Sequence, residues 1–159
     1  MKDPQDDSPM IEMFLHRIVF RGAADQQYIH LRERDGERAF PIVIGTSEAM
    51  EIHRVVSNQE LVRPMTHKLA YTLIQALGHR ILHVDITDLR DNTFHARLVL
   101  ARDDGDRRIE IDSRPSDAIA LALRAHCPIR VSESVLEQVR SDRAKDKLEE
   151  PDDEGEAEE

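Results

Sequence analysis

The sequence predicts a single-domain α+β fold, a mixed α/β arrangement in which a largely antiparallel mixed sheet carries about four helices. Its 159 residues, 40% of them hydrophobic, suit one domain with its own core. Short segments in which apolar and polar residues alternate, as in half-buried strands, are interspersed with segments of helical periodicity. Turn residues such as Asp35-Gly36 and Asp91-Asn92 separate consecutive alternating segments, which favours antiparallel hairpins.

Three strands and two helices are expected in the first half of the chain. The strands cover 13–20, 28–34 and 39–45, and the second pairs with the third. A helix follows Gly45 with Thr46 or Ser47 as its N-cap, and its apolar face is Ala49, Ile52, Val55 and Val56. Thr66 is expected to cap a second helix that ends at Gly78, with an apolar stripe of Leu69, Leu73, Ile74 and Leu77.

The second half predicts four strands and two helices. The strands cover 82–87, 94–100, a segment around Ile109 and Ile111, and 129–131. Pro115 suits the first turn of a helix that is apolar nearly all round from Ala118 to Ala125, so this helix should be central and buried. Ser132 is expected to cap a last helix that carries Val135, Leu136 and Val139.

Charged residues gather at the two ends of the chain. The net charge is −10, but residues 142–159 hold ten acidic and three basic residues, and residues 1–9 hold three acidic and one basic. The part between them is close to neutral, with 18 bases against 19 acids. We predict a disordered N-terminus over 1–10, a folded domain over 11–140 and an acidic disordered tail over 141–159. A near-neutral domain keeps nucleic acid open as a partner.

The composition also bears on the compartment. Cys127 is the only cysteine, so it forms no disulfide within the chain, and its apolar neighbours predict a buried thiol in a reducing compartment. The first residues contain no apolar run like that of a secretory signal, and no window approaches the ~18 apolar residues of a membrane span. We therefore expect a cytoplasmic protein that does not bind a membrane.

The first candidate for chemistry is Arg-Pro-Met-Thr-His at 63–67. Arg63 precedes a predicted helix start, where free backbone N–H groups and the helix dipole favour an anion. His67 in the first turn has the chemistry of a general acid or base. The alternative interpretation is a capping turn with a surface histidine.

The second candidate is Asp-Ser-Arg-Pro-Ser-Asp at 112–117, which leads from a strand into a helix. Ser113 is expected to cap this helix, and Asp117 lies at the positive end of its dipole. A functional interpretation places Arg114 on phosphate and Asp112 or Asp117 on a metal ion. Helix-start chemistry alone explains the same residues.

The third candidate is the segment 87–94, in which Asp88 and Asp91 lie at the end of a hairpin and either join a metal-binding carboxylate set or only shape the turn. The sequence contains no Gly-rich phosphate loop, no zinc-type Cys/His spacing and no Gly-x-Ser-x-Gly elbow. It also lacks a basic stripe with interleaved aromatic residues, which is typical of single-strand binding.

Taken in order, these segments resemble the bifunctional nuclease family. The matching pieces are residues 40–45 followed by Glu48-Ala49, then 63–67, 87–94, 111–122 and 128–131, about two thirds of the chain. The resemblance implies a compact mixed-sheet domain, a homodimer or higher homo-oligomer, and activity on both DNA and RNA in bacteria and plants. Members commonly carry Asp where this chain has Lys68. If the Asp of other members binds a metal ion, this chain lacks that ligand. If the Asp only complements the helix dipole, its replacement by Lys68 costs about 0.5 kcal/mol of stability.

Two hypotheses follow. In the first, implied by the resemblance, the chain is a metal-dependent nuclease. Its catalytic residues are then His67, Asp112 and Asp117, its Mg²⁺ or Mn²⁺ ligands are Asp88, Asp112 and Asp117, and its phosphate-binding residues are Arg63, Arg114, Ser113 and Ser116. In the second, the chain is a non-catalytic oligomeric regulator or adaptor that binds a partner or a small anion at the same helix starts.

Overall fold

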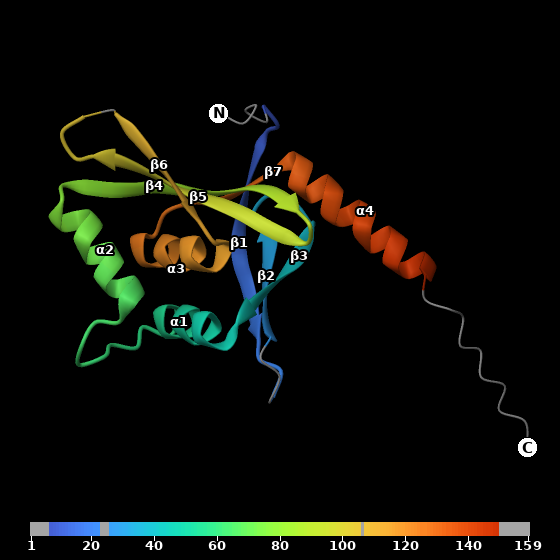
Figure 1. Cartoon of the computed structure of the whole chain (residues 1–159), viewed down its shortest axis with the longest axis horizontal. Coiled ribbons are helices and arrows are strands. Elements are labelled where there is room, and N and C mark those ends of the chain that lie inside the picture. The colour runs from blue at the N-terminus through green and yellow to red at the C-terminus, as the bar shows by residue number, and fades with distance from the viewer. Residues whose placement is uncertain (1–6, 23–25, 106, 150–159) are drawn as a thin grey trace, which may run out of the picture.

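A seven-stranded mixed sheet is the centre of the computed structural model, which describes residues 7–22, 26–105 and 107–149 (Figure 1). The strands are β1 (Met10–Val19), β2 (Gln26–Glu33), β3 (Ala39–Gly45), β4 (His79–Arg90), β5 (Thr93–Arg102), β6 (Arg108–Ser113) and β7 (Ile129–Ser132). The helices are α1 (Thr46–Val56), α2 (Thr66–Ala76), α3 (Pro115–Ala125) and α4 (Glu133–Glu149). The strand order is β3-β2-β1-β7-β4-β5-β6, and β4 pairs with β7 in parallel while the other pairs are antiparallel. This confirms the predicted α+β class.

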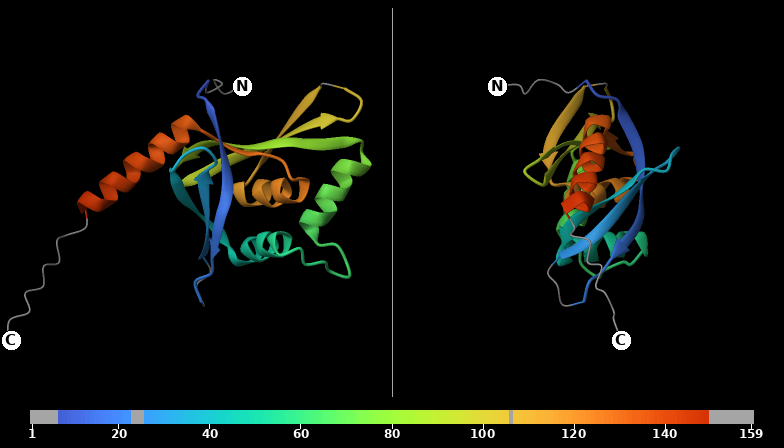
Figure 2. Two further views of the ribbon diagram at one scale, coloured as in Figure 1. Left: turned by 180° about the vertical axis from the view of Figure 1, so that it is seen from behind. Right: turned by 90° about the vertical axis from the view of Figure 1, so that its right-hand side faces the viewer.

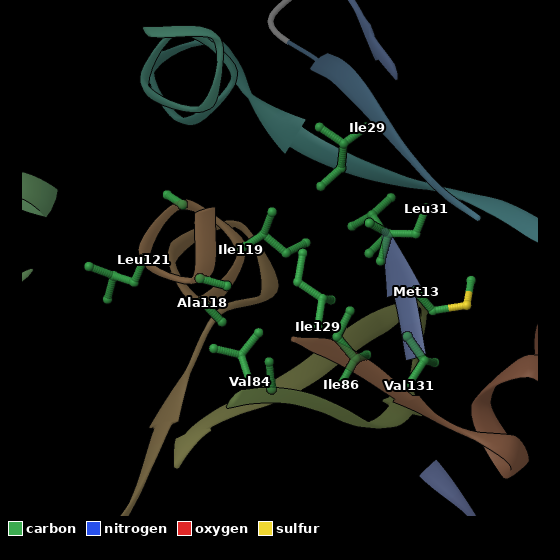
Figure 3. Packing of buried hydrophobic residues seen from close by; sticks show 14 of the residues in the cluster. Met13, Ile29, Leu31, Val84, Ile86, Ala118, Ile119, Leu121, Ile129 and Val131 are labelled. Carbon is green, nitrogen blue, oxygen red and sulfur yellow. The ribbon is translucent and has the colours of Figure 1, made fainter. Parts of the chain in front are cut away.

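Helix α3 is the centre of the core. Pro115 begins it, as predicted, and the five consecutive residues from Ala118 to Ala122 are all buried. The helix packs against α1, α2, β4 and β5. Figure 3 shows Ala118 and Ile119 on the side of the helix that faces Val84 and Ile86 of β4 and Ile129 of β7. Each fully buried Ile or Leu side chain contributes about 1.5–3 kcal/mol of hydrophobic free energy, so this helix is the main attachment of the helical layer to the sheet.

Helix α4 packs on β4 and β7 through the buried Val135 and Leu136 and then projects from the body (Figure 2). It continues to Glu149, so residues 141–149, which the charge pattern assigned to the tail, are helical. Strand β1 begins at Met10, the last residue of the predicted N-terminal segment. Residues 7–9 are described and belong to no helix or strand, whereas residues 1–6 and 150–159 of the two predicted terminal segments lie outside the described residues. No helix in the described ranges is long and apolar enough to cross a membrane.

The predicted side-chain caps of α1, α2 and α3 are wrong. The N-caps are Gly45, Met65 and Arg114, and none of the three makes a side-chain capping hydrogen bond. Thr46 and Thr66 are instead the first helical residues. The Oγ of Ser113 is buried and has no hydrogen-bond partner among the described residues. The first backbone N–H groups of these helices are therefore not consumed by the caps.

The apolar stripe expected on α2 does not face the core. Leu69, Leu73 and Leu77 are 50%, 51% and 74% exposed, whereas Ile74 packs against the core together with Ala70 and Tyr71. The reason is that α3 already covers this part of the sheet, so α2 lies at the rim and contacts the body along one narrow face. The end of α2 agrees with the prediction, since Gly78 adopts a φ of +70° just after the helix.

A carboxylate lies buried in the middle of the sheet. Asp85 of β4 is 0% exposed, and its two oxygens accept hydrogen bonds from Arg130 at 2.7 and 3.0 Å and from Arg97 at 3.2 and 3.3 Å. The Nδ1 of His83 lies 3.0 Å from Asp85 Oδ1. Burial alone would raise the pKa of Asp85, but these cationic partners hold it below its ordinary value. The group ties β4, β5 and β7 together.

Candidate functional site

Side chains from the first turns of three helices meet at one place. Glu48 is the third residue of α1, His67 the second of α2 and Asp117 the third of α3, while Arg114 is the N-cap of α3. Hydrogen bonds and ion pairs join these four residues in a chain, which we call the helix-start cluster. The core packing of α3 against α1 and α2 brings their starts together.

Asp117 is the centre of the helix-start cluster. Its Oδ1 lies 2.8 Å from His67 Nε2, and its Oδ2 lies 2.8 Å from Arg114 Nε. Arg114 Nη2 is 3.1 Å from Asp117 Oδ1, so guanidinium and carboxylate form a bidentate pair. Arg114 Nη1 also lies 3.1 Å from Glu48 Oε1.

The hydrogen bonds define which nitrogen of His67 is available. Partial burial would raise the pKa of Asp117, but hydrogen bonds from Arg114 and then His67 hold it below the ordinary value, so the carboxylate is ionised at neutral pH. An ionised carboxylate only accepts, so His67 Nε2 carries a proton and donates it to Asp117. In the neutral imidazole the Nδ1 is then the unprotonated nitrogen and can act as a base.

The helix-start cluster is partly open to solvent. The side chains of His67, Glu48 and Asp117 are 19%, 20% and 28% exposed, and Arg114 is 66% exposed. Of the five N–H bonds of a guanidinium, Arg114 uses three toward Glu48 and Asp117, which leaves two for another acceptor. The pairing with Asp117 raises the pKa of Arg114, so it stays cationic. Uncapped helix starts add backbone N–H groups that favour an anion.

The other predicted site residues lie at several places. Ser116 is buried in the first turn of α3, 6% exposed, next to the helix-start cluster in sequence. Asp112 stands opposite Arg97 on β5, whereas the neighbouring Ile111 stands opposite the core residue Leu98. Side chains alternate between the faces of a sheet, so Asp112 lies on the face away from the core helices. Asp88 is bonded to its neighbours, Arg90 and the backbone N–H of Leu89. Arg63 lines a pocket beside α2.

The donor set for a metal ion is not assembled. Among the described residues, no three Asp, Glu, His or Cys side chains are grouped so that they could hold an ion. Of the three expected ligands, Asp117 is engaged by His67 and Arg114, Asp112 lies on the opposite face and Asp88 pairs with Arg90. The residues present therefore do not fit the predicted three-carboxylate site.

Glu48 was not among the candidates chosen from the chemistry of the sequence. It appeared only in a family-like segment, followed by Ala49. Its signal is positional, because it occupies the third place of a helix, as Asp117 does. The positive end of the helix dipole stabilises a carboxylate at this place in any helix, so the position alone does not distinguish a site residue from a structural one.

Comparison of the sequence with known proteins finds a family and several relatives. Residues 29–144 match the model of the bifunctional nuclease domain. The chain belongs to this family. A protein of Mycobacterium tuberculosis described as uncharacterized is 46% identical over 114 residues, which cover 72% of this chain and 66% of that protein. Bifunctional nuclease 2 of Oryza sativa subsp. japonica is 30% identical over 115 residues, 71% of this chain and 35% of the plant protein.

Bifunctional nuclease 1 of Oryza sativa subsp. indica is 26% identical over 120 residues and is likewise matched over 36% of its length. The chain thus spans less than two thirds of the mycobacterial relative and about a third of the plant relatives. The similarity covers the family domain, which contains all four residues of the helix-start cluster. It establishes kinship and makes nuclease chemistry the first activity to consider.

Proposed function

We propose that this chain hydrolyses phosphodiester bonds of DNA and RNA at the helix-start cluster. The observation that carries the proposal is the hydrogen-bonded series His67–Asp117–Arg114, which combines a base, its orienting carboxylate and a cation at one partly open place. The family membership of residues 29–144 supports nucleic acid as the substrate. The near-neutral charge of residues 10–141 agrees with it.

Each residue has a distinct role in the proposed reaction. His67 Nδ1 accepts a proton from the water that attacks phosphorus, the bond from phosphorus to the leaving sugar oxygen breaks, and that oxygen takes a proton from solvent. Asp117 keeps the imidazole in the required tautomer and stabilises its charged form. The two free N–H bonds of Arg114 bind the phosphate oxygens and offset the charge that develops on them. Glu48 holds the far side of the guanidinium so that it keeps this direction. No step is assigned to a metal ion, because the expected ligands are not grouped.

Purified protein incubated with a plasmid and with single-stranded RNA tests the proposal. Cleavage is expected for the wild type and a loss of about 100-fold or more for His67→Ala, in line with the usual contribution of a general base. Parallel reactions with Mg²⁺, with Mn²⁺ and with a chelator measure any metal requirement. His95→Ala is a matched control, because His95 also lies partly buried in the domain but outside the cluster. Equal cleavage by wild type and His67→Ala would refute the assignment.

The second candidate is a non-catalytic module that binds a partner or a small anion. The mutual pairing of Glu48, His67, Arg114 and Asp117 favours it, because the same contacts join the starts of α1, α2 and α3 and so have a structural use without catalysis. Nucleic-acid binding without turnover in all three metal conditions would select this candidate. We keep the cytoplasm as the proposed location, since the single cysteine leaves no disulfide within the chain.

We further propose that the chain forms a homodimer through β6. This strand is at one edge of the sheet and contains no proline, whereas at the other edge β3 contains Pro41 and its Ala39 carbonyl accepts a hydrogen bond from Arg143. Antiparallel pairing of two β6 strands about Glu110 places Arg108 opposite the partner's Asp112 and Ile109 opposite the partner's Ile111.

The charges and burial of β6 fit this pairing. Arg108 and Asp112 form no ion pair with another described residue, and Ile109 and Ile111 are 39% and 41% exposed. The two copies of Glu110 meet at the centre, but Arg97 lies 3.1 Å from Glu110 in each copy and offsets their repulsion. Cross-strand pairs of opposite charge and apolar pairs each stabilise a sheet by about 0.2–1 kcal/mol.

A further inference from the structure

A second concave site lies between α1, the connection to α2, α2 itself and the end of α3. Its volume is about 650 Å³. Its charged lining residues are Glu51, Arg54, Glu60, Arg63, Lys68 and Arg124. We call it the α1–α2–α3 pocket. Sites for small ligands commonly have volumes of about 300–1,000 Å³, so its size suits a small organic molecule.

The α1–α2–α3 pocket is cationic although the chain is acidic. Four Arg and Lys side chains line it against two Glu side chains, while the whole chain carries a net charge of −10. Glu51 is only 2% exposed and is already paired with Arg54, at 3.0 Å, and with Arg124. Burial would raise the pKa of Glu51, but these two cations hold it below the ordinary value. The concave surface therefore concentrates positive potential, which attracts an anion.

Several of its donors have no acceptor within the described part of the protein. Arg63 is exposed and forms no hydrogen bond or ion pair with another described residue. The Nζ of Lys68 has only a ring contact, 6.0 Å from the centroid of Tyr71. Arg124 directs Nη2 to Glu51, but its buried Nε has no hydrogen-bond partner among the described residues. Arginine and lysine donors grouped in a pocket in this way are suited to phosphate oxygens.

The remaining lining is apolar and aromatic. Tyr71 forms one wall, and the other apolar residues are Val55, Leu61, Pro64, Met65 and Leu123. Leu61 and Met65 are 49% and 48% exposed, so apolar surface is available to a ligand. A phosphate alone would leave this surface in water. A ligand with both a phosphate and a flat ring would cover it, because aromatic rings stack on the faces of nucleobases.

We propose that the α1–α2–α3 pocket binds a nucleoside monophosphate. The phosphate contacts Arg63 and Lys68, and the base lies against Tyr71 and the apolar wall. Such a group reaches the pocket either as a free nucleotide or as the phosphorylated 5′ end of a nucleic-acid strand. The binding does not depend on catalysis at the helix-start cluster, because neither Arg63 nor Lys68 belongs to it.

Isothermal titration of the full-length protein with AMP, adenosine and inorganic phosphate tests the proposal. Saturable binding of AMP is expected, with each of the other two at least about tenfold weaker, since the phosphate and the base both contribute. A tetranucleotide with a 5′-phosphate and the same tetranucleotide without it form a second pair of ligands. Preference for the phosphorylated strand over AMP would identify the strand end as the source, and equal or tighter binding of AMP would identify the free nucleotide.

Arg63→Ala/Lys68→Ala is expected to weaken AMP binding by at least about tenfold, because two charge-assisted contacts are lost. Arg90→Ala is the matched control, since Arg90 is also exposed but lies at the β4–β5 turn. If the double variant loses its circular dichroism spectrum, Arg63→Gln and Lys68→Gln are measured singly. His67→Ala should retain AMP binding, which separates this proposal from the nuclease. Unchanged AMP affinity in the folded variants, or no saturation at millimolar AMP, would overturn the proposal.

Discussion

Asp85→Asn measures what the buried carboxylate contributes to the sheet. The side chain of Asp85 is 0% exposed and receives hydrogen bonds from Arg97 and Arg130, so asparagine removes the counter-charge of Arg130 and leaves Arg97 only its exposed pairing with Glu110. Breaking a buried ion pair by removing one partner costs about 3–5 kcal/mol. Arg97 and Arg130 are 31% and 32% exposed and regain part of their hydration, so we expect the lower end, about 3 kcal/mol. In a chain of this size that lowers the Tm by about 6–12 °C.

Urea unfolding followed by circular dichroism at pH 7 is the assay, with Asp88→Asn as control. Asp88 lies on the same strand but is 44% exposed and pairs with the exposed Arg90, so its loss should cost less than about 1 kcal/mol. The pKa of Asp85 lies below its ordinary 3.8, so its contribution is present above that pH and is lost as the pH falls through the lower value of the folded state. A cost below about 1 kcal/mol for Asp85→Asn, or equal costs for the two variants, would refute the reasoning.

Three further predictions concern the dimer, the thiol and the helix-start cluster. Light scattering should show that Arg108→Asp dissociates the dimer, because the new carboxylate faces the partner's Asp112, and that Arg108→Asp/Asp112→Arg restores the dimer. A monomeric wild type would contradict the β6 interface. Partial burial raises the pKa of the half-buried Cys127 to about 11, so a thiol reagent at pH 8 should react far more slowly with the folded protein than in 8 M urea. Equal rates would show that the fold does not shield this thiol. Glu48→Gln should raise the KM for RNA about fivefold through a less ordered Arg114, and an unchanged KM would remove Glu48 from the site.

Periodicity predicts the strands of this fold well and α2 poorly. In β2 the alternation buries Ile29 and Leu31, both 0% exposed, because the strand has one solvent face and one core face. In α2 an apolar stripe is present, but the helix has little core to contact at the rim of the sheet, and Leu73 stays 51% exposed. Which apolar face is used depends on what lies across from it, and the sequence of one helix does not contain that information.

The same limit applies to Asp85. The alternation of apolar and polar residues over 82–87 favours a solvent-facing side for Asp85. Only the pairing of β4 with β5 and β7 brings Arg97 and Arg130 to it. Two side chains from distant segments convert an expected surface carboxylate into a buried one. Long-range pairing of this kind has no signature in a short window of sequence.

The candidate site was predictable in its residue types and only partly in its membership. Arg114 and Asp117 share a helix start, so their proximity follows from the sequence, and His67 joins them because α2 packs on α3. Asp112 lies only two residues before Arg114, the N-cap of the same helix, but it belongs to strand β6. Its register opposite Arg97 decides its face and separates it from Asp117.

The start of α2 serves both proposed sites because successive residues of a helix point about 100° apart. His67 turns toward α3 and reaches Asp117, while Lys68 turns toward Tyr71 and the α1–α2–α3 pocket. A phosphate held by Lys68 therefore lies one residue along the helix from the proposed base. A nucleic-acid strand that reached from the α1–α2–α3 pocket to the helix-start cluster would have one phosphate at Lys68 and the bond to be cut at His67, so the pocket would position the strand for cleavage. Lys68→Ala should then raise the KM for a nucleic-acid substrate and leave kcat unchanged, whereas His67→Ala should lower kcat and leave KM unchanged.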